Sequence, residues 1–175
     1  MITRGADGSV DGMYVTDIQA LTTTGVEALR DRTEIVDALY RFGLGQDLKD
    51  RDLFASAFAA DAELDFRPAA ARWGADVPLM TGRDAIVGQI LALFAGRVDT
   101  THTVTNPRVR IDGDRADLTA IVEAQHLLSA DHGTFALLKN LYDVELVRDG
   151  GRWVVHRMRI ANVWYTGDPA AIFNG

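Results

Sequence analysis

Two residues far apart in the chain, Asp47 and His102, have side chains suited to proton transfer. Asp47 continues an apolar stripe of Val36, Tyr40 and Gly43 at helical spacing, so its carboxylate is expected to point inward. A buried carboxylate is costly unless another group pairs with it. His102 could be that partner, because an aspartate that accepts from one ring nitrogen fixes the tautomer and leaves the other nitrogen as a general base.

Two further residues are candidates for acid or base chemistry. His126 alternates with apolar residues of its strand, and it is either a second acid or base beside His102 or a hydrogen-bonded core histidine. Tyr40 could present its phenol to a substrate oxygen, although packing in a core is the commoner role of a helical tyrosine. Asp47 and His102 also have simpler interpretations, as the cap of the next turn and as a hydrogen-bonded strand histidine.

Other side chains are candidates for the wall of a substrate pocket. Asn140 and Tyr142 share one face of a predicted strand, and either could hydrogen-bond a ligand. Aromatic side chains would supply the apolar part of such a wall, although most aromatic residues in a chain of this kind belong to the core. The aromatic candidates are Phe66, Trp73, Phe94 and Trp164.

Several other chemistries fit the sequence poorly. The chain has no cysteine, which excludes disulfides, thiolate nucleophiles and cysteine metal sites. Residues 43–45 (GLG) lack the preceding strand and the third glycine of a dinucleotide fingerprint, and no phosphate-binding loop or serine nucleophile elbow is present. His102, His126 and Asp47 together resemble a metal site of two histidines and one carboxylate, and sequence spacing does not exclude it. We predict a site without metal or cofactor.

Composition limits the class of protein. The 175 residues are 47% hydrophobic and 25% charged, as in an ordinary globular domain, and the net charge of −7 argues against nucleic acid or anionic lipid as partner. Residues 1–24 lack the apolar run of a signal peptide, and no stretch reaches the roughly 20 apolar residues of a membrane helix. We therefore expect a cytoplasmic protein with a loosely ordered arm at 1–25 and a single domain at 26–175.

The first half of the chain has helical signals. Asp31 and Glu34 form a capping box for a first helix to about Gln46, and Asp50 caps a short second helix. Residues 62–66 alternate as a short strand, and 67–78 read as a loop or lid without reliable periodicity. A third helix is expected to begin at a cap formed by Thr81 with Asp84 and to stop at Gly96.

The second half has strand signals, which together with the helices predicts an α+β fold with a curved antiparallel sheet around a pocket. Residues 112–113 (DG) and 150–151 (GG) are hairpin turn sequences, so the last strands should be consecutive antiparallel neighbours. Pro107 implies a bulge or an edge position. The expected strands are 101–111, 115–129, 137–148 and 152–164.

The order of these elements and several short segments resemble the SnoaL-like branch of the nuclear-transport-factor-2-like (cystatin-like cone) superfamily. The likeness spans about 32–167, and its members include scytalone dehydratase, hexachlorocyclohexane dehydrochlorinase, polyketide cyclases and isomerases. The segments that carry it are 35–42, 46–50 (QDLKD), 58–62 (FAADA), 82–86 (GRDAI), 101–106 (THTVTN) and 151–155 (GRWVV).

The resemblance implies roles for particular residues. Eliminating enzymes of this branch pair an Asp at the end of the first helix with a His on a later strand, and Asp47 and His102 match those positions. His126 resembles the second pocket histidine of the scytalone dehydratases. The tyrosine that some dehydratases carry near the helix Asp is not matched, since Tyr40 is offset, and the 67–78 loop is longer than in the dehydrochlorinases.

The predicted function is therefore a cofactor-free lyase that carries out a dehydratase-type elimination on a small hydrophobic, cyclic carbonyl compound. An isomerase or polyketide cyclase with the same base is one alternative, and a non-catalytic small-molecule-binding domain is another. One face of the sheet would remain free to pack against another subunit, so we expect a homodimer or homotrimer.

Overall fold

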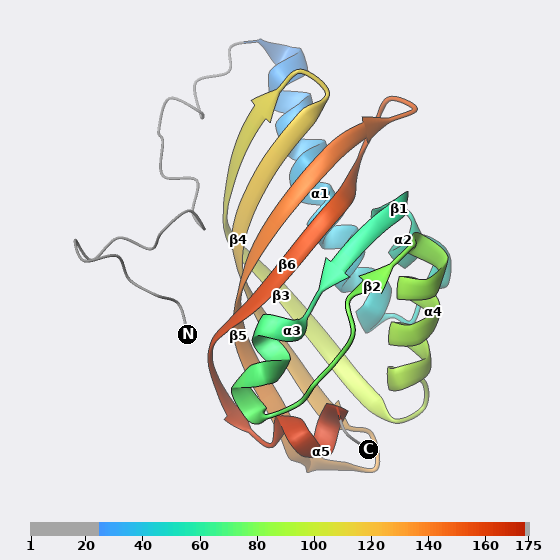
Figure 1. Ribbon diagram of the computed structural model, residues 1–175, viewed down its shortest axis with the longest axis vertical. Coiled ribbons are helices and arrows are strands. Elements are labelled where there is room, and N and C mark those ends of the chain that lie inside the picture. The colour runs from blue at the N-terminus through green and yellow to red at the C-terminus, as the bar shows by residue number, and fades with distance from the viewer. Residues whose placement is uncertain (1–24, 174–175) are drawn as a thin grey trace, which may run out of the picture.

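The computed structural model describes residues 25–173, so the predicted arm lies almost wholly outside the described residues. None of the helices in this part of the chain has the length and apolar character needed to cross a membrane. The elements in chain order are α1 (Val26–Asp47), α2 (Arg51–Ala55), β1 (Phe58–Asp65), α3 (Arg67–Ala70), a 3-10 turn (Ala71–Trp73), β2 (Met80–Thr81), α4 (Arg83–Phe94), β3 (Val98–Asp112), β4 (Arg115–Leu128), β5 (Asp131–Asp149), β6 (Arg152–Gly167) and α5 (Pro169–Phe173) (Figure 1).

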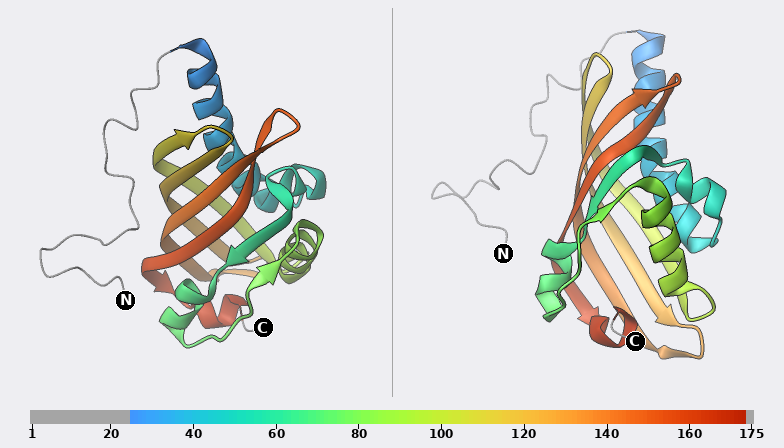
Figure 2. Two further views of the ribbon diagram at one scale, coloured as in Figure 1. Left: turned by 45° about the horizontal axis from the view of Figure 1, so that its top comes forward. Right: turned by 45° about the vertical axis from the view of Figure 1, so that its right-hand side comes forward.

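The predicted α+β class and curved sheet are confirmed. A six-stranded sheet has the order β2-β1-β6-β5-β4-β3, and its four long strands are consecutive antiparallel neighbours (Figure 2). Gly113, Gly150 and Gly151 have positive φ angles at the two predicted hairpin turns. Pro107 lies on the edge strand β3, where the register shifts between Thr105 and Arg108, as the bulge prediction required.

Strand β1 is the part of the sheet that the sequence did not predict correctly. It begins at Phe58 rather than at residue 62, and it pairs in parallel with β6 and antiparallel with the short β2. A parallel pair needs no hairpin turn between its strands, so no local turn sequence announces it.

The predicted helix starts are correct in one case of three. Asp50 caps α2 by accepting a hydrogen bond from the backbone N–H of Leu53, as expected. Asp31 instead lies inside α1, which begins at Val26, and its carboxylate binds side chains of later strands. Thr81 does not cap α4, because the capping position is Gly82 and no side chain caps the helix.

The predicted loop 67–78 is in part helical. It contains α3 and the 3-10 turn, and Ala69 and Ala70 of α3 are buried. Figures 1 and 2 place α3 close to α5 at one end of the sheet. A ring contact agrees with this placement, since Trp73 stacks on Phe173 with centroids 5.5 Å apart.

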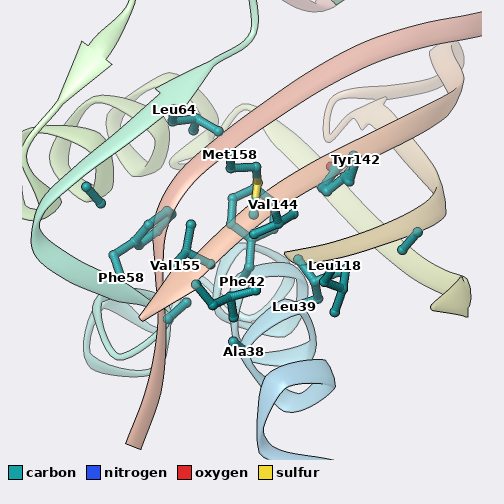
Figure 3. Packing of buried hydrophobic residues seen from close by; sticks show 14 of the residues in the cluster. Ala38, Leu39, Phe42, Phe58, Leu64, Leu118, Tyr142, Val144, Val155 and Met158 are labelled. Atoms are coloured by element: carbon teal, nitrogen blue, oxygen red, sulfur yellow. The ribbon is translucent and has the colours of Figure 1, made fainter. Parts of the chain in front are cut away.

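The main core lies between α1 and the concave face of the sheet (Figure 3). Phe42 of α1 is central to it, with edge-to-face contacts to Phe54, Phe58 and Tyr142. A smaller cluster around Phe94 and Ile172 closes the other end of the sheet. Residues of both clusters line one cavity.

Candidate active site

The cavity is about 290 Å³ in volume and is enclosed by the sheet, the end of α1, α4, the 66–80 segment and α5. That volume is at the small end of the range for small-molecule sites. Its wall is mostly apolar and includes the aromatic rings of Phe42, Phe66, Trp73, Phe94 and Phe173. The polar side chains on the wall are Gln46, Gln89, His102, His126, Asn140 and Tyr142.

Asp47 and His102 are in direct contact, as the sequence predicted. Oδ1 of Asp47 lies 2.7 Å from Nδ1 of His102, and Oδ2 of Asp47 accepts a hydrogen bond of 2.8 Å from the backbone N–H of His102. The side chain of Asp47 is only 15% exposed and that of His102 only 4% exposed. His102 lines the cavity, whereas Asp47 lies behind it. With Nδ1 bound to the carboxylate, Nε2 of His102 is the ring nitrogen left for proton transfer.

Two glycines allow α1 to come close enough for this contact. A Cβ atom on Gly43 would lie 2.9 Å from Cβ of His102, and one on Gly45 would lie 2.5 Å from backbone atoms of Phe54. Gly43 and Gly45, which do not fit a nucleotide-binding loop, therefore allow α1 to pack closely against β3 and against α2.

Thr100 and Lys49 extend the hydrogen-bond network behind His102. The Thr100 hydroxyl donates to Oδ1 of Asp47 at 2.9 Å, and Nζ of Lys49 donates to that hydroxyl oxygen at 3.2 Å. Burial acts to raise the pKa of Asp47, but the hydrogen bonds from His102 and Thr100 outweigh it, so the pKa is lower than usual. Asp47 is therefore an anion at neutral pH. Sequence reasoning missed Thr100, although it alternates with His102 on the same face of β3.

His126 lies beside His102, with ring centroids 5.6 Å apart, and it also contacts Phe94 and Phe173. Its exposed fraction is only 3%, and its Nδ1 has no hydrogen-bond partner among the described residues. Burial, assisted by the neighbouring His102, lowers the pKa of His126 to about 3. His126 is therefore neutral in the folded protein, and it can act as a hydrogen-bonding group but not as a resident cation.

Asn140 and Tyr142 both line the cavity from one face of β5, as predicted. Burial raises the pKa of Tyr142 well above its usual range, and the negative charge of Asp47 adds to the effect, so the phenol keeps its proton. Oδ1 of Asn140 accepts a hydrogen bond of 2.9 Å from Nδ2 of Asn162, a residue that sequence reasoning did not single out.

Three of the predicted aromatic wall residues line the cavity, namely Phe66, Trp73 and Phe94. Phe173 also lines it and was missed, because the short helix α5 was not predicted. The signal for that helix is the pair 168–169 (DP), in which Asp168 accepts from the backbone N–H of Ala171.

Two candidates lie outside the cavity wall. Tyr40 is 50% exposed on the outer side of α1, and Trp164 is 45% exposed on β6, so the structure corrects their assignment to the site. Tyr40 was placed on the inner stripe because the apolar pattern of α1 is wide. On β6 the bulge at Val163 shifts the inward and outward alternation by one residue, so Trp164 lies on the outer face. Within residues 25–173, no cluster of three metal-ligating side chains is arranged to hold an ion.

Comparisons with known proteins show the family and the fold of the chain. The model of the SnoaL-like domain family matches residues 27–159. Terrestric acid biosynthesis cluster protein E of Penicillium crustosum is 34% identical over 158 residues, which cover 86% of this chain and 95% of that protein.

Solved structures show the same fold. The Kfla4162 protein from Kribbella flavida superposes with a TM-score of 0.73 at 27% identity, covering 85% of this chain and 99% of that one. A putative scytalone dehydratase from Novosphingobium aromaticivorans gives 0.68 at 19% identity, covering 81% and 89% of the two chains.

Proposed function

The chain belongs to the SnoaL-like family, and from that premise we propose that it is a cofactor-free lyase acting on a small hydrophobic, cyclic carbonyl compound. The reaction is a dehydratase-type elimination in which His102, oriented by Asp47, removes a proton next to the carbonyl group. The observation that carries the proposal is the 2.7 Å contact between Nδ1 of His102 and the Asp47 carboxylate at the wall of an apolar cavity.

Each part of this pair has a defined task in such a reaction. Nε2 of His102 would take the α-proton, and the anionic Asp47 would stabilise the imidazolium that forms. The electron pair of the broken C–H bond becomes the new C=C bond as the C–O bond to the leaving hydroxyl breaks. The proton on His102 then passes to the departing hydroxide, so the products are an unsaturated carbonyl compound and water.

Neighbouring polar groups would stabilise the enolate charge that develops on the carbonyl oxygen. Tyr142 keeps its proton and lines the cavity, so its hydroxyl can donate to that oxygen. Neutral His126 can contribute a second hydrogen bond, but its depressed pKa makes it a poor source of a proton. In this proposal Tyr142 has the role that the sequence suggested for Tyr40.

The relatives support this class of reaction. The Penicillium relative is named for a biosynthesis cluster, which fits a protein that processes a small molecule. The structural likeness to a putative scytalone dehydratase is a likeness of fold. The chemistry is argued from the cavity and its acid and base groups.

The test is turnover of a panel of cyclic β-hydroxy ketones, followed by the ultraviolet absorption of the enone product. His102→Gln and Asp47→Asn are each expected to lower kcat by about 10²- to 10⁴-fold. Circular dichroism and thermal unfolding check that the variants remain folded. Undiminished turnover by either folded variant removes the pair from the mechanism.

The chain provides a matched control for these variants. His132 and Asp99 form a second histidine–aspartate pair, with Nε2 of His132 2.9 Å from Oδ2 of Asp99, on the exposed surface. His132→Gln removes an imidazole of the same kind outside the cavity, and its kcat should equal that of the unmodified protein.

An isomerase or a polyketide cyclase would share the first step, because each begins with removal of an α-proton by the same base. Exchange of α-protons in D₂O, followed by NMR, detects that step whatever the product. Product analysis then separates elimination from isomerisation and ring closure. Exchange that is absent for every bound ketone would favour a non-catalytic binding domain.

A further inference from the structure

Asn162 is a buried polar residue on β6 that the proposed chemistry does not use. It is 5% exposed and does not line the cavity. The register of β5 and β6 pairs Lys139 with Trp164 and Asn140 with Asn162, so β6 carries one extra residue, Val163, between the two pairs. This bulge places the two asparagines directly opposite each other.

The orientation of the Asn162 amide follows from its neighbours. Its Nδ2 lies 2.9 Å from the backbone carbonyl oxygen of Trp164 and 3.3 Å from that of Lys139. Backbone carbonyls only accept hydrogen bonds, so the atom that faces them must be the NH₂ group. The third contact of this group, at 2.9 Å, is with the Asn140 side chain, which must therefore present its oxygen.

Fixing the oxygen of Asn140 also fixes the rest of its amide. The Asn140 side chain is 1% exposed and lines the cavity, and no described residue accepts a hydrogen bond from its Nδ2. A donor on the wall of a mostly apolar cavity is costly to leave without an acceptor. An acceptor atom on a ligand would remove that cost.

Tyr142, two residues along the same face of β5, also lines the cavity, and its phenol keeps its proton. This hydroxyl can donate beside the NH₂ group of Asn140, so the wall along β5 offers two donors. A carbonyl oxygen, with two lone pairs and no hydrogen, suits such a wall.

We propose that Asn162 is a positioning residue that holds the Asn140 amide with its N–H donors toward the cavity, so that the site selects ligands carrying an acceptor oxygen over ligands of equal shape carrying only a donor. The inference deepens the proposed function by naming the polarity of the ligand. It rests on that function only in taking the cavity as the ligand site, and it is tested by binding without turnover.

Two bicyclic probes of similar size separate the alternatives. 1-Indanone carries a carbonyl acceptor and no donor, whereas indole carries an N–H donor and no conventional acceptor. Isothermal titration calorimetry should give a dissociation constant for 1-indanone about ten-fold lower than that for indole. If the protein binds neither probe, or binds indole at least as tightly, the inference is overturned.

The variants test whether the preference depends on the two asparagines. In Asn140→Leu the ratio of the dissociation constant of indole to that of 1-indanone should fall from about ten to about one, because the donor is gone. In Asn162→Leu the Asn140 amide is free to turn, so the ratio should also approach one, with indole bound more tightly than by the unmodified protein. Val163→Ala changes the same bulge on its exposed side and should keep the ratio.

A merely structural role of Asn162 predicts a different result. Loosening the bulge would weaken the binding of both probes equally and leave the ratio of their dissociation constants near ten. That outcome rejects the positioning role. If Asn162→Leu fails to fold, Asn162→Ser replaces it, since its hydroxyl can still donate to one bulge carbonyl but does not hold the Asn140 amide. An unchanged ratio in folded Asn162→Ser counts equally against the inference.

Discussion

The backbone of Gly43 lies directly against the side chain of His102, since a Cβ atom on Gly43 would lie only 2.9 Å from Cβ of His102. Asp47 is one helical turn further along α1, and it binds both the ring and the backbone N–H of His102. The glycine therefore sets the distance at which α1 meets β3, and the carboxylate depends on that distance to reach the imidazole.

Gly43→Ala should destabilise the protein and reduce activity together. The added methyl group clashes with His102, and overpacking of about 1–3 kcal/mol exceeds the gain of up to about 1 kcal/mol from helix propensity. A displacement of the end of α1 would also misalign the base, so kcat should fall by ten-fold or more. Urea denaturation and turnover of the ketone panel measure the two effects.

Gly88→Ala is the matched control for this prediction. Gly88 lies inside α4, and a Cβ atom there would have no heavy atom within 4 Å. The same substitution should therefore stabilise the protein by about 0.5–1 kcal/mol without changing kcat. Equal effects of the two substitutions would show that the packing of Gly43 against His102 is unimportant.

Thr100→Val should make His102 a less effective base without abolishing its function. The Thr100 hydroxyl donates to the oxygen of Asp47 that also binds His102, so its loss should raise the pKa of Asp47 and loosen its orientation. We expect kcat to fall by about ten-fold, less than in Asp47→Asn. Thr103→Val, on the exposed face of the same strand, is the control and should be neutral. A loss as large as that of Asp47→Asn would contradict a purely supporting role.

His126 should make the stability depend on pH. Its pKa is about 3 in the folded protein and about 6.5 when unfolded, so below pH 6.5 the unfolded chain takes up a proton that the folded chain does not. Its contribution to stability is thus full above pH 6.5 and is lost as the pH falls toward 3. Between pH 7 and pH 5 the loss should be about 1–2 kcal/mol, measured by urea denaturation.

His126→Leu isolates this contribution. The variant lacks the titrating ring, so its stability should change less than that of the unmodified protein between pH 7 and pH 5. His132→Leu removes an exposed histidine and should keep the full pH dependence. If His126→Leu shows the same pH dependence as the unmodified protein, His126 does not resist protonation in the fold.

The pairing of Asp47 with His102 was predictable because two independent signals agree. Helical periodicity turns Asp47 inward, and the family resemblance places His102 opposite it. Tyr40 was misplaced by the same periodicity, since the stripe that contains Asp47 runs along the margin of the buried face, where some positions are buried and others exposed.

Long-range features escaped prediction for a different reason. Asn162 meets Asn140 only because β6 bulges at Val163, and nothing in the local sequence marks that bulge. Asp31 has the pattern of a helix cap, yet its partners, Arg148 and Trp153, lie more than one hundred residues away. The contacts of such residues depend on strand pairing, which a single sequence does not specify.

Those contacts of Asp31 join α1 to the hairpin of β5 and β6. The carboxylate accepts hydrogen bonds from both terminal nitrogens of Arg148, at 3.0 and 2.8 Å, and one of 3.1 Å from Nε1 of Trp153. The guanidinium of Arg148 also lies 4.6 Å from the ring centre of Trp153. Hydrogen bonds from Arg148, with one from Trp153, outweigh burial and lower the pKa of Asp31.

Asp31→Asn should therefore destabilise the protein by about 1–2 kcal/mol at pH 7, since an amide loses the bidentate pair but can still accept from Trp153. Asp114→Asn is the control, because Asp114 also accepts from Arg148 but is 82% exposed, so its loss should cost less than about 0.5 kcal/mol. A lowered pKa means that the contribution of Asp31 is full above the unfolded value near 4 and is lost as the pH falls below it. The difference in unfolding free energy between Asp31→Asn and the unmodified protein should accordingly shrink from pH 7 to pH 3. A difference that is constant with pH would mean that Asp31 acts through packing and not through its charge.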